Sequence, residues 1–270
     1  MTLLRQIRPV VFAVILSAFA TAAFAQGTQV PSTFEPQVGQ AGKDVVWVPT
    51  PQPLVDKMLD LAEVTPEDFL IDLGSGDGRT VISAAKRGLR AQGIEYNPDM
   101  VELARRNAAT EGVSETAVFA NADLFETDFS AAQVITMFLL PEINMKLRPA
   151  LLNMAPGTRI VSNSFTMEGW EPDLSERITE CTSWCTAHLW IVPARVEGAW
   201  QMPQGVLTLA QEFQVVSGTL GSTTLTDAKL RGEEITFTIG DAVYNGRVQG
   251  DNIRGTVTGG SGGAFTAMKQ

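Results

Sequence analysis

Short apolar runs alternate with segments of helical period over the first two thirds of the sequence. Apolar runs bounded by turn residues are typical of buried strands, and apolar positions three and four residues apart are typical of helices. Their alternation predicts a doubly wound, mostly parallel α/β sheet. We expect strands at residues 69–73, 91–95, 116–120, 133–140, 157–162 and 188–192, the last paired with a strand near 178–183, and helices at 51–62, 80–87, 98–111 and around 147–154, where Pro149 interrupts the pattern.

From about Gly198 onward the pattern changes to short alternating runs between glycine turns. Strands that recur at this spacing without helical segments are typical of a β-meander. The sequence therefore predicts a domain at residues 45–197 and a small all-β domain at residues 198–270, a meander or half-barrel. The boundary is expected between Pro193 and Pro203.

The first 25 residues have the pattern of a signal peptide. Arg5 and Arg8 form a basic start, residues 9–20 are an apolar run, and Ala23-Phe-Ala25 is a small-x-small cleavage site. These features predict cleavage after Ala25 and export to the periplasm. The alternative is an uncleaved membrane anchor, although the apolar run is short for a full span. No later stretch could cross a membrane, and residues 26–44 indicate a linker or extended arm.

Charge and cysteine content narrow the possible partners. The formal net charge is -10, whereas nucleic acid binding usually requires a basic surface, so we expect no nucleic acid partner. The two cysteines, Cys181 and Cys185, could form a small disulfide loop in an oxidising compartment or remain free thiols. Two thiols without a neighbouring histidine make a poor zinc site, and no metal is expected.

A glycine-rich turn follows the strand at residues 69–73. It is spaced Asp72-x-Gly74-x-Gly76-x-Gly78 and leads into a helix, whereas the dinucleotide fingerprint G-x-G-x-x-G would place its third glycine at position 79, which is Arg79. Glycines let the backbone turn sharply and let a ligand approach the main chain. A carboxylate just before the turn suits a cationic ligand better than a pyrophosphate.

The spacing D-x-G-x-G-x-G, followed by Glu95 at the end of the next strand, resembles class I S-adenosylmethionine-dependent methyltransferases. The resemblance covers residues 45–195 and implies a Rossmann-like methyltransferase sheet with S-adenosylmethionine as the cofactor. It implies that the turn holds the methionine and sugar portions, that Glu95 accepts hydrogen bonds from the two ribose hydroxyls, and that Asp123 contacts the adenine amino group. The residues that the resemblance assigns to cofactor binding are Thr50, Asp72, Gly74, Ser75, Gly76, Gly78, Glu95, Tyr96, Asp123 and Leu124.

Some of these residues have plainer interpretations. Thr50 precedes Pro51 and is also a good helix N-cap. Tyr96 and Leu124 would flank the ribose and adenine, or would simply pack. Asp123 could instead cap the segment that follows it.

Three segments are similar to a narrower group, the small protein-lysine methyltransferases of the mitochondrial ATP-synthase c-subunit type, and more distantly the Dot1-like histone-lysine methyltransferases. These segments are residues 48–51, 72–79 and 95–98. The resemblance implies a protein lysine as the methyl acceptor. Methyl transfer to a neutral amine needs alignment and exclusion of water rather than a catalytic dyad. The sequence offers only Glu142 and Asn163 as weak catalytic candidates.

Two other functions remain open at this point. One is an exported scaffold that keeps the fold and binds the cofactor without turnover. The other is a methyltransferase with a small-molecule acceptor, although the metal ligands or histidine base that such enzymes often use are not apparent.

Overall fold

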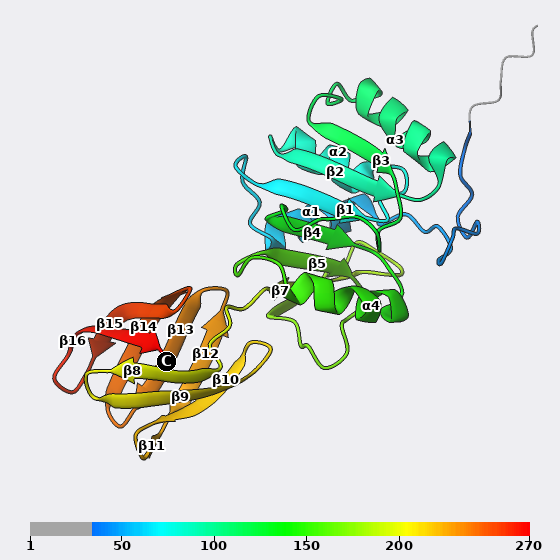
Figure 1. Ribbon diagram of the computed structural model, residues 1–270. Coiled ribbons are helices and arrows are strands. Elements are labelled where there is room, and N and C mark those ends of the chain that lie inside the picture. Colours follow the sequence, from blue (N-terminus) through cyan, green and yellow to red (C-terminus); the bar gives the residue numbers. More distant parts are fainter. Residues whose placement is uncertain (1–33) are drawn as a thin grey trace, which may run out of the picture. The chain divides into compact units, whose positions relative to one another are not determined.

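The structure is a computed structural model that describes residues 34–270 (Figure 1). The predicted signal peptide at residues 1–25 and the first part of the predicted linker, 26–33, lie outside the described residues. Within residues 34–270, no helix combines the length and apolarity needed to span a bilayer.

The first part of the described chain forms a seven-stranded sheet in the order β3-β2-β1-β4-β5-β7-β6. Strands β1 to β5 run parallel, and β7 is antiparallel to both β5 and β6. This arrangement confirms the predicted mostly parallel sheet. Its strands are β1 (Phe69–Leu73), β2 (Arg90–Glu95), β3 (Ala117–Asn121), β4 (Val134–Met137), β5 (Arg159–Asn163), β6 (Leu174–Arg177) and β7 (Thr186–Ile191).

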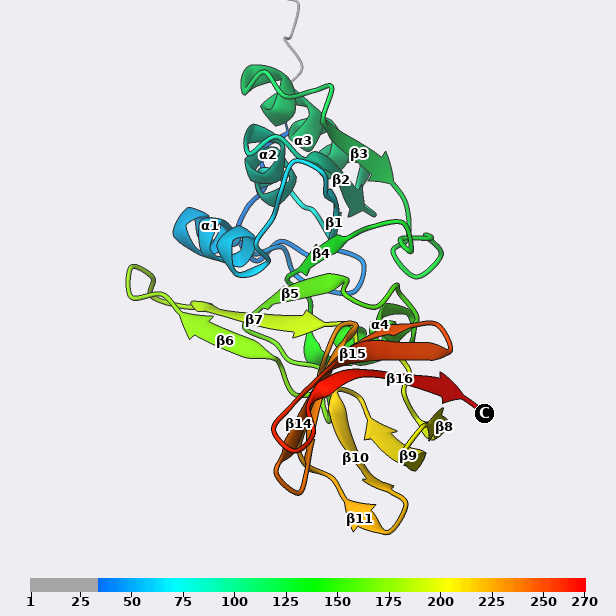
Figure 2. The ribbon, with the colours of Figure 1, turned by 90° about the vertical axis from the view of Figure 1, so that its left-hand side faces the viewer.

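Helices cover both faces of this sheet (Figures 1 and 2). Side chains alternate between the two faces along each strand, so strands that are apolar throughout need a cover on both. On β1, Leu70 packs into the core shared with α1, α2 and α3, whereas Ile71 packs into the core shared with α4. The helices are α1 (Gln52–Leu61), α2 (Arg79–Lys86), α3 (Pro98–Thr110) and α4 (Pro141–Leu152).

The sheet order places a crevice beside β1. The chain moves outward to β2 and β3 on one side of β1, then returns to β4 and β5 on the other side. Ligands of open α/β sheets bind at such a reversal, outside the carboxyl ends of the strands. The loops after β1, β2, β3, β4 and β5 all begin at this edge.

Three local predictions were wrong. Helix α1 begins at Gln52 with Pro51 in the N-cap position, and Thr50 makes no cap. Helix α4 continues through Pro149, which lies near its exposed end, where one lost backbone hydrogen bond is tolerated. The strand paired with β7 is β6 rather than residues 178–183, because a turn closes between Cys181 and Cys185.

The rest of the chain forms a nine-stranded antiparallel sheet with its own core, as the prediction of an all-β unit requires. Its order is β11-β10-β9-β8-β16-β15-β14-β13-β12, so β8 lies beside the last strand. The backbone N–H of Leu225, just before β12, donates to Gly218 in β10, so the two ends approach as in a barrel. The strands are β8 (Gly198–Met202), β9 (Gly205–Glu212), β10 (Val215–Leu220), β11 (Thr223–Thr224), β12 (Thr226–Arg231), β13 (Glu234–Ile239), β14 (Ala242–Gln249), β15 (Asn252–Thr258) and β16 (Gly263–Lys269).

Candidate active site

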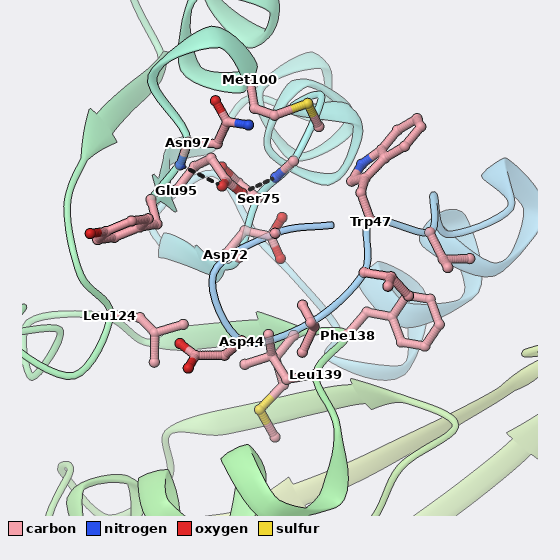
Figure 3. A pocket seen from close by; sticks show the side chains of 18 of the residues that line it. Asp44, Trp47, Asp72, Ser75, Glu95, Asn97, Met100, Leu124, Phe138 and Leu139 are labelled. Atoms are coloured by element: carbon pink, nitrogen blue, oxygen red, sulfur yellow. Dashed lines mark hydrogen bonds between the residues drawn. The ribbon is translucent and has the colours of Figure 1, made fainter. Parts of the chain in front are cut away.

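A pocket of about 210 Å³ lies at the carboxyl edge of the parallel strands. Its wall combines residues 40–50, the glycine turn after β1, the loops after β2, β3, β4 and β5, and Trp184. In Figure 3, Glu95 and Asn97 lie on one side of Asp72, and Phe138 and Leu139 lie on the other. The predicted cofactor residues on the wall are Thr50, Asp72, Gly74, Ser75, Gly76, Glu95, Tyr96, Asp123 and Leu124.

The glycine turn brings bare main chain to the pocket. Gly74 and Gly76 adopt left-handed φ values of 77° and 53°, which glycine tolerates best. A Cβ at Gly76 would lie 2.7 Å from Nε1 of Trp47, so a larger residue would collide with the Trp47 side chain that packs against the turn. Gly78 does not lie on the wall; a Cβ there would meet the packed side chains of Phe119 and Ala104. The structure therefore gives Gly78 a packing role.

Asp72 is a buried carboxylic acid at the centre of the pocket. Its side chain is 6% exposed, and Thr136 Oγ1 donates a 2.7 Å hydrogen bond to its Oδ1. Burial raises the pKa of Asp72 to about 7; the Thr136 hydrogen bond opposes this shift, and the charges of Asp77 and Glu95 add to it. A buried carboxylate surrounded by other acids is stabilised by a cationic ligand.

The Glu95 carboxylate is held by backbone donors at the end of β2. The N–H of Gly76 donates to Oε2 at 3.0 Å, and the N–H of Asn97 donates to Oε1 at 2.9 Å (Figure 3). Each oxygen keeps a lone pair, because a carboxylate has about four acceptor sites. A fixed pair of acceptors is suited to the two hydroxyls of a ribose.

A turn at residues 39–47 contributes to the pocket wall near Glu95. It is closed by backbone hydrogen bonds between Gly39 and Trp47 and between Trp47 and Gln40. Lys43 pairs with Asp123 Oδ2, and its ammonium lies 4.6 Å from the centre of the Tyr96 ring. The hydrogen bond from Lys43 holds the pKa of Asp123 below its usual value. The sequence pattern predicts Lys43 in a linker, whereas the structure pairs it with Asp123; the apolar residues 45–48 are the local signal of an ordered segment.

Neither catalytic candidate reaches the pocket wall. Glu142 is exposed on the first turn of α4. Asn163 is fully buried; its Nδ2 donates to Thr50 Oγ1 at 3.3 Å, and its Oδ1 accepts from Ser164. Asn163 therefore positions Thr50, whose backbone oxygen also accepts from Arg79.

The wall beyond Asp72 is apolar and aromatic. Phe138, Leu139 and Leu140 follow β4, Phe165 follows β5, and Trp184 lies in the loop between β6 and β7. Cys181 and Cys185 form a disulfide across that loop, which settles the alternative left open by the sequence. Among the described residues, no group of histidine, cysteine and acidic side chains is arranged to hold a metal ion.

Comparison with known proteins identifies the family. A model described as the ANTKMT methyltransferase domain matches residues 72–174. The protein-lysine N-methyltransferase of Saccharolobus islandicus (strain REY15A) is 38% identical over 151 residues, which are 55% of this chain and 94% of that protein. This chain belongs to the class I S-adenosylmethionine-dependent methyltransferases. This chain is also 38% identical over 105 residues to the ATP synthase c-subunit lysine N-methyltransferase of Homo sapiens. The match covers 38% of this chain and 45% of that protein.

This chain is also similar in fold to a solved structure. It is described as an RNA methyltransferase from Salinibacter ruber in complex with S-adenosyl-L-homocysteine. It is 47% identical, has a TM-score of 0.52, and covers 55% of this chain and 96% of that chain. The methyltransferase therefore uses S-adenosylmethionine, and its pocket fits that molecule. The buried Asp72 suits a cation, and Glu95 presents two fixed acceptors.

Proposed function

We propose that this methyltransferase transfers a methyl group to the side-chain amine of a protein lysine. The observation that carries the proposal is the division of the pocket into an acidic part around Asp72, Glu95 and Asp123 and an apolar, aromatic part after β4 and β5. A lysine side chain has a long apolar stem that such a wall can hold. The names of the relatives from Saccharolobus islandicus and Homo sapiens support this acceptor.

The roles of the wall residues follow from their contacts. Glu95 would accept hydrogen bonds from the ribose hydroxyls, with Tyr96 and Leu124 beside the sugar and base. Asp123 would accept from the adenine amino group once Lys43 moves. Asp72 would face the methionine portion, next to the main chain of Gly74 and Gly76.

The bound cofactor supplies an electrophilic methyl group, so the protein needs no acid–base dyad once the amine is neutral. The chain's contribution is to align the amine with that methyl and to exclude water. The apolar residues Leu139 and Phe138 line this part of the pocket and reduce its access to water. Thr50, buried and held by Asn163, lies on the same wall, where its hydroxyl would reach the cofactor carboxylate.

RNA is a second candidate acceptor, favoured by the description of the relative from Salinibacter ruber. The chain's net charge of -10 opposes it, because a phosphate backbone is repelled by an acidic surface. A small-molecule acceptor would also fit the apolar wall, but none of the relatives compared above is described as having one.

We also propose that the protein is exported to the periplasm after cleavage behind Ala25. The Cys181–Cys185 disulfide supports this location, because such bonds persist in oxidising compartments. Cell fractionation and N-terminal sequencing of the purified protein test it. Recovery of protein that begins at Met1 from the cytosol would overturn the proposal.

The acceptor is tested by transfer of tritium from labelled S-adenosylmethionine to poly-L-lysine or to total RNA. We expect label in poly-L-lysine, recovered as ε-N-methyl-lysine after hydrolysis. Glu95→Ala removes the ribose acceptors and should weaken S-adenosylhomocysteine binding by on the order of 1.5–3 kcal/mol, about tenfold or more. Glu142→Ala, an exposed acid outside the pocket wall, is the matched control and should bind normally. Label in RNA alone, or in neither acceptor while the protein binds S-adenosylhomocysteine, would refute lysine methylation.

A further inference from the structure

Three aromatic side chains from separate loops meet on the pocket wall. Phe138 stacks on Phe165 with ring centres 6.0 Å apart, and the Trp184 ring lies 5.1 Å from Phe165 and 5.9 Å from Phe138. All three line the pocket on the side reached from β4 and β5, away from Asp123. We call this set the aromatic cluster.

The aromatic cluster is not simply part of the core. Trp184 is 42% exposed, and Phe138 and Phe165 are half-buried. By contrast, the three rings that pack together in the C-terminal sheet, Phe237, Tyr244 and Phe265, are all buried. The aromatic cluster therefore keeps ring surface available to a ligand.

Surrounding residues hold Phe165 at a defined position. Its carbonyl accepts a 2.7 Å hydrogen bond from Ser162 Oγ and a 3.3 Å hydrogen bond from Asn144 Nδ2. Both donors are fully buried. The Phe165 N–H in turn donates to the carbonyl of Asn163, so this loop is fixed at the end of β5.

The Cys181–Cys185 disulfide holds Trp184 at a defined position. Trp184 adopts a left-handed φ of 58°, which is unfavourable for a bulky residue and persists only when its surroundings impose it. The Cys181–Cys185 bond closes the loop around it, and Cys185 is buried against the domain. An open loop would leave the Trp184 ring free to leave the pocket.

We propose that the aromatic cluster is the passage by which the acceptor lysine reaches the methyl donor, and that the disulfide is the device that keeps Trp184 in it. The inference rests on the proposed lysine acceptor. Aromatic faces attract an ammonium group and pack against its alkyl stem, so three rings that pack together on one side of the pocket favour a long-chain cation over a neutral or anionic side chain. Trp184 is then a specificity-determining residue, and Cys181 and Cys185 are positioning residues.

The test compares steady-state kinetics with poly-L-lysine for the full-length protein and its variants. Trp184→Ala should raise KM for poly-L-lysine by about fivefold to tenfold while kcat and the affinity for S-adenosylhomocysteine change little. Trp184→Phe should retain most of the wild-type KM, because it keeps an aromatic face. The paired variant Cys181→Ser with Cys185→Ala should resemble Trp184→Ala. Phe125→Ala, an exposed aromatic residue that does not line the pocket, is the matched control.

The outcomes separate this inference from the proposed function. Wild-type protein that binds S-adenosylhomocysteine but labels no lysine would refute the acceptor, and the passage with it. Normal labelling with an unchanged KM in Trp184→Ala would refute the passage alone. A loss of S-adenosylmethionine affinity without loss of S-adenosylhomocysteine affinity would assign the rings to the cofactor sulfonium instead. A wild-type KM in the paired cysteine variant would refute the role of the disulfide.

Discussion

The buried Asp72 should make cofactor binding depend on pH. Burial raises its pKa to about 7 in the free protein; the hydrogen bond from Thr136 opposes the shift, and the charges of Asp77 and Glu95 add to it. A cationic ligand favours the ionised carboxylate, so binding is coupled to proton release at and below pH 7. For a group of pKa 7 that is ionised in the complex, the dissociation constant should rise by about tenfold from pH 8 to pH 6.

Asp72→Asn isolates this effect. The amide oxygen of asparagine can accept the hydrogen bond that Thr136 Oγ1 donates at 2.7 Å, so the packing is kept while the negative charge and its titration are lost. Calorimetric titration with S-adenosylmethionine at pH 6, 7 and 8, in two buffers with different ionisation enthalpies, measures both affinity and proton release. At pH 7 the wild-type protein should release about half a proton per ligand more than the variant.

The pH curves of the two proteins should therefore converge at low pH. At pH 8 the variant should bind more weakly than wild type, and this difference in affinity should be about tenfold smaller at pH 6. Parallel curves, or wild-type binding that tightens as the pH falls to 6, would contradict the assignment of this titration to Asp72.

The free energy of unfolding should also depend on the ionisation of Asp72, and it should fall as the pH rises. The folded pKa of Asp72, about 7, lies above its ordinary value of 3.8. Its contribution to the free energy of unfolding is therefore fully present below pH 3.8 and is lost as the pH rises through 7. Urea unfolding of the free protein at pH 8 should show Asp72→Asn to be more stable than wild type; an equally or less stable variant would contradict this.

Three further changes test the pocket and the packing beside it. Thr136→Val removes the donor to Asp72, raises the pKa of that carboxyl further, and should move the midpoint of the binding curve upward by about one pH unit, measured by the same titrations. Lys43→Ala frees Asp123 and should tighten S-adenosylhomocysteine binding by about fivefold at most, since exposed ion pairs are weak; weaker binding would show that Lys43 instead covers the ligand. Gly78→Ala places a methyl group against packed side chains at φ 82° and should destabilise the fold by about 1–3 kcal/mol in urea unfolding; an unchanged stability would contradict the packing role.

The grouping of Asp72, the glycine turn and Glu95 on one pocket wall could be predicted from the sequence because these parts are local. Asp72 lies near the end of β1, Gly74 and Gly76 lie in the turn that follows, and one strand–turn–helix–strand unit carries the chain from there to Glu95. Apolar periodicity and turn residues determine such a unit, and parallel pairing of β1 with β2 then brings the two ends together. The same local signals predicted both sheets, although they misplaced the partner of β7 and the start of α1.

The tertiary structure alone decided the rest of the site. Whether a glycine lines a pocket or a core depends on what packs around it, and this separates Gly76, on the pocket wall, from Gly78, which packs against Phe119 and Ala104. Lys43 meets Asp123, and Phe138 meets Trp184, across many intervening residues. Such contacts depend on strand order and on how loops close at one edge of the sheet. A local pattern of apolar and polar residues does not determine strand order, because it shows only which side chains of a helix or strand face the core.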